Sequence, residues 1–115
     1  MLAEKTYEMN VHDLLKEINE KLSRFQRIIL DNRNKKDEKS MSAELLMYTP
    51  EEWETISITI IHYQMFMQSV REKNGNEDEL KSFLVSNVRF LGYLRDIVSS
   101  LYSRLPQTGE GKAKA

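Results

Sequence analysis

The sequence predicts a small all-α protein in which three long antiparallel helices form a bundle, with a short extra helical segment between the first two. Three observations lead to this prediction. Apolar residues recur at alternating spacings of three and four along most of the chain. Three residue patterns typical of helix starts precede these stretches. Except for Gly92, the glycines and prolines stand at the ends of the periodic stretches or beyond them.

The length of 115 residues and the hydrophobic content of 40% are those of one domain with one modest core. We expect a flexible N-terminus over 1–9, a helical bundle over 10–105 and a disordered tail over 106–115. The 17 basic and 18 acidic residues leave a net charge of −1, which gives no overall attraction to nucleic acid or anionic lipid. The absence of cysteine and of a secretory signal favours a cytoplasmic protein.

The first helix is predicted over about 10–34. Asn10 and Asp13 have the spacing of a capping box, in which each side chain bonds the other residue's free backbone N–H. The apolar positions then alternate by four and three, as in a coiled coil. They are Val11, Leu15, Ile18, Leu22, Phe25 and Ile29.

The second helix is predicted over about 49–73, because Thr49, Pro50 and Glu52 combine an N-cap, a proline at the first helical position and a capping-box glutamate. This helix contains TISITIIHYQMFMQSV, sixteen residues without a charge. The stretch is too short and too polar to span a membrane. Its seam of three-four spacing is formed by Trp53, Ile56, Ile60, Tyr63, Met67 and Val70.

The third helix is predicted over about 76–105, with Asn76 as its N-cap and Pro106 as its stop. Asn87 falls in its leucine-rich seam, where one asparagine can fix the register and chain number of a coiled coil. Val85, Gly92 and Ser99 repeat every seven residues on the same helix. We expect this stripe of small side chains to be a helix-packing surface.

The second helix has a further apolar face, which lies opposite its seam at 100° per residue. Ile58, Ile61 and Met65 form it, with Phe66 beside them. This face could be covered in three ways: by Leu45, Leu46 and Tyr48 of the connector folded back onto it, by a second copy of the chain, or by a different protein.

The sequence holds no pattern that indicates catalysis. It lacks the Glu-x-x-His pairs of a di-iron bundle and the Gly-x-Ser-x-Gly turn of a serine hydrolase. His62 is the only histidine inside a strong helical pattern, and such a residue is more often structural than a ligand. We therefore expect no enzymatic activity, no catalytic residue, no cofactor and no metal.

Leu105 to Gly109 read Leu-Pro-Gln-Thr-Gly, which resembles a sortase sorting signal. Such a signal is followed by an apolar segment and a basic tail, whereas EGKAKA follows here. We expect the match to carry no sorting function.

These observations favour a protein–protein interaction module, such as an adaptor, assembly factor, inhibitor or chaperone, that acts through helical surfaces as a homo-oligomer. The alternative is a nucleic-acid-associated helical protein, such as a small ribonucleoprotein subunit or a regulatory accessory factor. Its candidate basic patch is Lys21, Arg24, Arg27, Arg33, Lys35 and Lys36. Acidic residues are interleaved with these, and no aromatic residues stand among them to stack on bases.

Overall fold

The computed structural model describes residues 2–106, with side chains described for 11–37 and 39–106. Helices make up this part of the chain, and no strand occurs within it. The elements are α1 (Leu2–Asn32), the 3-10 turn η1 (Glu38–Ser40), α2 (Ala43–Leu46), α3 (Pro50–Glu72), α4 (Glu77–Ser86) and α5 (Val88–Tyr102).

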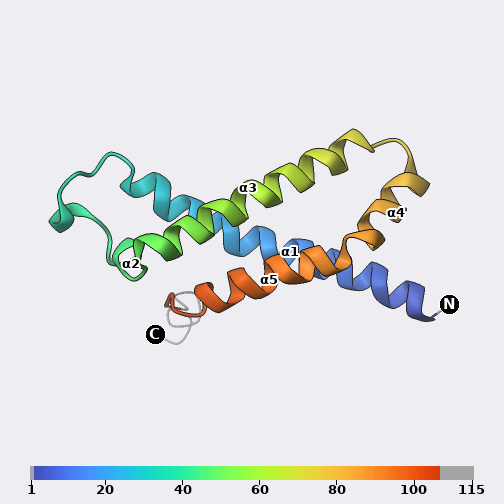
Figure 1. Cartoon of the computed structure of the whole chain (residues 1–115), viewed down its shortest axis with the longest axis horizontal. Helices are drawn as coiled ribbons and strands as arrows, with labels where there is room; N and C mark the ends of the chain where they lie inside the picture. The colour runs from blue at the N-terminus through green and yellow to red at the C-terminus, as the bar shows by residue number, and fades with distance from the viewer. Residues whose placement is uncertain (1, 107–115) are drawn as a thin grey trace, which may run out of the picture.

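The long helices cross the molecule in turn (Figure 1). In that view α1 runs from right to left, α3 returns to the right, and α5 runs left again after α4 has turned back toward α1. The most extensive contact between elements joins α1 and α5. A helical bundle is thus present in part, built mainly on that pair.

The predicted third helix is broken, so three long antiparallel helices are not confirmed. Asn87 separates α4 from α5 with φ −105° and ψ 14°, and its side-chain Nδ2 donates to the carbonyl of Phe83 at 2.7 Å. Asparagine has a low helix propensity because its side chain competes for backbone groups in this way. The break tilts α4 so that Phe83 stacks on Phe66 of α3, with ring centroids 5.2 Å apart.

The ends of the helices differ from the predictions by several residues at three places. The first helix begins at Leu2, so residues 2–9 are helical where a flexible terminus was predicted. This segment contains no glycine or proline and is rich in helix-forming residues, and the capping pattern at Asn10 is therefore bypassed. The same helix ends at Asn32 instead of 34, and α5 ends at Tyr102, before Pro106.

The start of α3 is confirmed in detail. Thr49 caps it with φ −72° and ψ 162°, its hydroxyl accepts from the Glu52 N–H, and the Glu52 carboxylate accepts from the Thr49 N–H. Pro50 occupies the first turn, where no intrahelical N–H partner is needed. The chain turns between α3 and α4 with Gly75 at φ +100°, a conformation that favours glycine.

The core lies where α1, α3 and α5 face each other. The first helix buries Leu14 and Ile28 more completely than Leu15 and Ile29, because a straight helix of 3.6 residues per turn drifts away from a strict seven-residue repeat. Phe25 is fully buried and meets the rings of Tyr48, Trp53 and Tyr102 edge to face at 5.7, 5.9 and 5.9 Å. This aromatic cluster joins α1, α3, the connector between them and the end of α5.

The connector is held by a buried asparagine that terminates α1. Asn32 Nδ2 donates to the Ile28 carbonyl at 2.8 Å and to Ser42 Oγ at 3.0 Å, and its Oδ1 accepts from the Ser42 N–H at 2.8 Å. Ser42 in turn caps α2, the short helical segment that the sequence predicted. A single side chain therefore directs the chain from α1 into α2.

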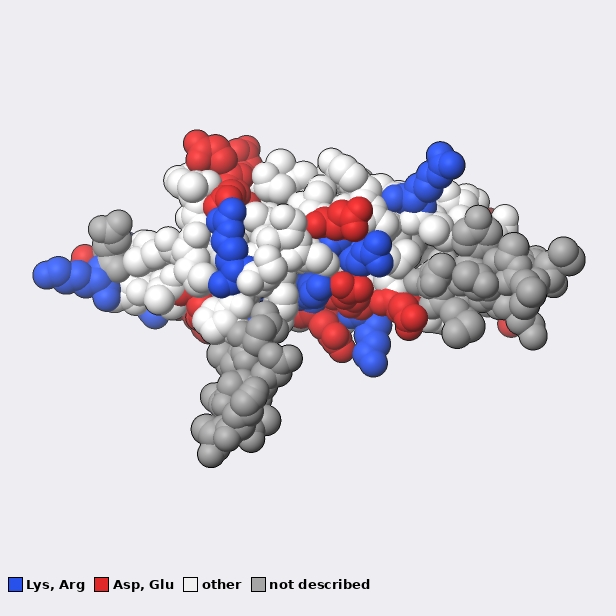
Figure 2. Space-filling model, turned by 90° about the horizontal axis from the view of Figure 1, so that it is seen from below, with Lys and Arg blue, Asp and Glu red and all other residues white. Residues whose placement is uncertain are grey.

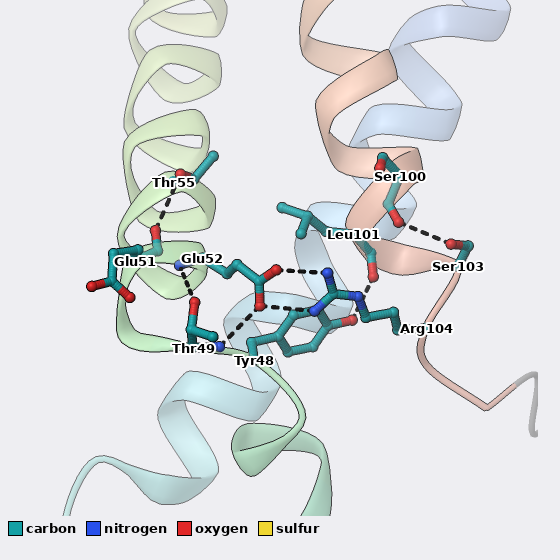
Figure 3. A network of polar contacts seen from close by, with 9 residues as sticks. All are labelled: Tyr48, Thr49, Glu51, Glu52, Thr55, Ser100, Leu101, Ser103 and Arg104. Carbon is teal, nitrogen blue, oxygen red and sulfur yellow. Dashed lines mark hydrogen bonds and ion pairs between the residues drawn. The ribbon is translucent and has the colours of Figure 1, made fainter.

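A polar network joins the start of α3 to the end of α5 (Figure 3). Arg104 forms a two-point ion pair with Glu52, with nitrogen–oxygen distances of 2.8 and 2.6 Å, and its guanidinium lies 5.3 Å from the centre of the Tyr48 ring. The Tyr48 hydroxyl donates to the Leu101 carbonyl. The hydrogen bonds from Arg104 and from the Thr49 backbone lower the pKa of Glu52 from 4.5 to about 2.

We expect Arg104→Gln to lower the melting temperature most near neutral pH. A carboxyl group whose pKa is depressed on folding stabilises the fold above its unfolded pKa and loses that effect as the pH falls through the folded one. The difference between wild type and variant should therefore shrink between about pH 4.5 and 2. Arg95→Gln, which removes the exposed pair with neighbouring Asp96 and a weaker attraction to Glu17, is the control and should show a smaller difference. A difference for Arg104→Gln that stayed constant down to pH 2 would contradict this role for the ion pair.

Candidate interaction surface

The outer side of α3 carries a row of exposed apolar side chains, Ile58, Ile61 and Met65, called the outer row below. Their exposed fractions are 45%, 52% and 63%. They lie on the opposite side of the helix from the buried Ile56 and Ile60. In the described part of the chain, the other exposed large apolar side chains are the neighbouring Leu46 and Met47 at the end of α2 and single residues on α1, α4 and α5, whereas these three follow one another along one helix face.

The connector does not cover the outer row. Tyr48 packs on Phe25, and the Leu45 carbonyl accepts from the indole N–H of Trp53 at 2.7 Å, so both lie on the inner side of α3. Leu46 is 50% exposed. The interpretation in which this segment folds back onto Ile58, Ile61 and Met65 is therefore wrong, and the three side chains are exposed in the single chain.

Two hollows flank the outer row, and Met65 lines both. The larger, of about 660 Å³, lies between α1 and α3 and carries several amide side chains. It is lined by Asn19, Leu22, Gln26, Ile60, Ile61, Tyr63, Gln64, Met65, Met67, Gln68 and Arg71. The smaller, of about 310 Å³, is lined by His62, Met65, Phe66, Ser69, Phe83 and Phe90. Met65 thus forms a ridge between the two hollows, Ile61 borders the larger one, and Ile58 lines neither.

Phe66 does not share the exposure of the outer row. Its side chain is 6% exposed, it stacks on Phe83, and its ring centroid lies 6.1 Å from that of Phe90. It forms the base of the smaller hollow and belongs to the core, contrary to the prediction that placed it on an exposed face.

The small-residue stripe faces α1 of the same chain. Ser99 accepts from Lys21 at 2.9 Å and donates to Glu17 at 3.2 Å. Gly92 and Val85 line two further hollows together with residues of α1. The break at Asn87 also separates Val85 from the other two residues. A methyl group built on Gly92 meets no atom within 4 Å, so no neighbour within the described chain requires glycine there.

We expect Gly92→Ala to raise the stability of the protein by up to about 1 kcal/mol, because alanine favours the helix interior and open space receives its methyl group. Thermal unfolding measures the effect. Gly75→Ala is the control, because the positive φ of Gly75 should make the same substitution destabilising there. A lower melting temperature for Gly92→Ala, together with weaker self-association, would instead place Gly92 in a close contact between chains.

Asn87 uses its amide within its own chain, as the cap between α4 and α5. The amide nitrogen of this asparagine has its hydrogen-bond partner within the described chain. That partner is a backbone carbonyl four residues earlier and not a side chain across a helix seam. Within the chain Asn87 marks the bend between α4 and α5, and its role in fixing a coiled-coil register stays a prediction.

The candidate basic patch is divided by the fold. Lys21 and Arg24 turn toward α5, with their charged groups 5.4 and 5.5 Å from the centre of the Tyr102 ring. Lys21 also pairs with Glu17 at 2.7 Å, and this hydrogen bond lowers the pKa of Glu17. The remaining four basic residues, Arg27, Arg33, Lys35 and Lys36, are exposed. Acidic and basic side chains are interspersed on the face drawn in Figure 2.

Comparison with protein-family models, curated proteins and solved structures finds no match for this chain. Within residues 2–106, every helix is too short or too polar to cross a membrane. The same residues contain no group of three or more histidine, aspartate or glutamate side chains that could hold a metal ion.

Proposed function

We propose that this protein is a non-enzymatic protein–protein interaction module that works as a homo-oligomer, and that the outer row of α3 is its contact surface. The observation that carries the proposal is the exposure of Ile58, Ile61 and Met65 along one helix face. Burying such a side chain completely from full exposure is worth about 1.5–3 kcal/mol, and about half of that remains available here because the row is 45–63% exposed. A partner that covers the row therefore gains binding free energy from groups already held in place by a folded helix.

The uncharged character of the surroundings supports this surface over the others. No charged residue occurs between Glu54 and Arg71, so a partner that lies along α3 desolvates few ionic groups. The amide side chains of the larger hollow supply hydrogen-bonding groups at the edge of the ridge. The nucleic-acid alternative has no comparable support. Lys21 pairs with Glu17 and Arg24 with Glu44, and both cations lie near the Tyr102 ring.

The test is the solution mass measured by light scattering over a hundredfold concentration range. We expect the wild-type mass to rise with concentration above the 13.6 kDa of one chain. The Ile61→Glu variant should stay folded and keep the mass of a single chain at every concentration. Leu30→Glu is the matched control, because Leu30 is 57% exposed on α1 and lines neither hollow beside the outer row, so its variant should associate like wild type. A wild type that stays at the single-chain mass throughout, or two variants that behave alike, would contradict the proposal.

A further inference from the structure

The helix α4 is held more weakly than α3 and α5. In the described part of the chain, none of its ten residues is buried, whereas α3 buries five residues and α5 three. It lies at one end of the molecule, tilted against both α3 and α5 (Figure 1). The smaller hollow separates it in part from α3 and α5, and a further hollow of about 280 Å³ lies between it and α1. A segment with few buried apolar contacts opens at a lower cost in free energy than the rest of a protein.

An aromatic stack fixes α4 to α3. The rings of Phe83 and Phe66 are inclined by 18°, with centroids 5.2 Å apart, and the Lys73 ammonium lies 4.7 Å from the centre of the Phe83 ring. Phe83 is half-buried, whereas Phe66 beneath it is 6% exposed. Departure of α4 therefore uncovers Phe66, which lines the smaller hollow together with Met65.

Asn87 has a hydrogen bond to make both when α4 is packed and when it has left. In the structure its backbone N–H donates to the Leu84 carbonyl at 3.2 Å, and its side-chain Nδ2 takes the place of the usual backbone donor to the Phe83 carbonyl, at 2.7 Å. Among the described residues it makes no side-chain hydrogen bond that caps α5. Unfolding of α4 releases this amide, and asparagine is among the residues preferred as a helix N-cap. Its Oδ1 can then accept from the backbone N–H of Arg89 or Phe90 in the first turn of α5.

We propose that α4 is a conformational switch, which changes between the helix packed on Phe66 and an unfolded segment while α1, α3 and α5 stay folded. A helix of ten residues is too short to persist alone in water, so α4 loses its helical structure when it leaves Phe66. The break at Asn87 confines the change to α4, because α5 then begins at an N-cap of its own. The change takes place within one chain and does not depend on the outer row being a contact surface.

The experiment is hydrogen exchange of the backbone amides of the full chain, followed residue by residue by nuclear magnetic resonance. In the wild type we expect the helical amides of α4 to share one protection factor, roughly a hundredfold below those of Leu94 and Val98 in α5. Asn87→Asp removes the donor to the Phe83 carbonyl, keeps an N-cap acceptor for α5 and places a negative charge at the C-terminal end of α4. It should lower the protection factor of α4 by a further factor of about ten.

Asn76→Asp is the matched control, because it makes the same chemical change at the other end of α4. Asn76 Oδ1 accepts from the Glu79 N–H at 3.1 Å, and a carboxylate can accept the same bond, so the protection factor of α4 should stay close to that of the wild type. Wild-type α4 amides as well protected as those of Leu94 and Val98 would overturn the proposal, because α4 would then open only when the whole chain unfolds. An equal fall in protection for Asn76→Asp and Asn87→Asp would also overturn it, because the amide of Asn87 would then not favour the packed helix.

Discussion

Phe25→Ala is expected to lower the free energy of unfolding by about 3–5 kcal/mol. Phe25 is fully buried, and three rings from different segments pack against it edge to face. Truncation removes the buried ring, leaves a cavity and breaks all three aromatic contacts. A domain of this size has a total stability of about 5–15 kcal/mol, so a large share of it depends on this one side chain.

Chemical denaturation followed by circular dichroism measures the loss for Phe25→Ala. Tyr93→Ala is the control, because Tyr93 is 63% exposed on α5 and its truncation should change the unfolding free energy by less than about 0.5 kcal/mol. Equal effects of the two substitutions would show that the aromatic cluster does not anchor the long helices to the end of α5.

Ile60→Glu is expected to destabilise the protein by more than about 4 kcal/mol, whereas Ile61→Glu should change its stability by less than about 1 kcal/mol at low protein concentration. The two variants carry the same substitution one residue apart on the same helix. Ile60 is 8% exposed and faces the core, so a carboxylate there loses its hydration without gaining a partner. Ile61 is 52% exposed, and a carboxylate there stays hydrated.

Denaturation curves of both variants, recorded below the concentration at which the chain associates, provide the comparison. Similar losses at both positions would mean that the outer side of α3 is part of the core of one chain. The case for a free contact surface would then fail, whatever the mass of the wild type.

The parts of the fold that depend on neighbouring residues were predictable from the sequence. The start of α3 follows from Thr49, Pro50 and Glu52, and the cap of α4 from Asn76, because each cap is made within a few residues. The division of α3 into a buried and an exposed face also followed from the spacing of its apolar residues.

The features that the sequence did not reveal depend on contacts between distant residues. The break at Asn87 is accompanied by the stacking of Phe83 on Phe66, and no local signal fixes where that stacking occurs. The role of Arg104 depends on Glu52, 52 positions earlier, and that of Lys21 on Ser99, 78 positions later. The Lys21–Ser99 hydrogen bond uses one residue of the predicted basic patch and one of the small-residue stripe within the chain.

The candidate site was predictable only in part for the same reason. Helical periodicity placed Ile58, Ile61 and Met65 opposite the core, and the structure leaves them exposed. Periodicity also placed Phe66 near this face, but the tilt of α4 covers it with Phe83. The hollows on either side of the row depend on how α1, α4 and α5 lie against α3, which no pattern within α3 specifies.

The measurement that tests the central claim most directly is the methyl spectrum of the unmodified chain, recorded by nuclear magnetic resonance during a hundredfold dilution. We expect the methyl signals of Ile58, Ile61 and Met65 to shift together as the assembly dissociates, while those of the equally exposed Leu30 and Leu46 stay in place. Signals from the outer row that do not move while the mass falls would place the contact elsewhere and contradict the account.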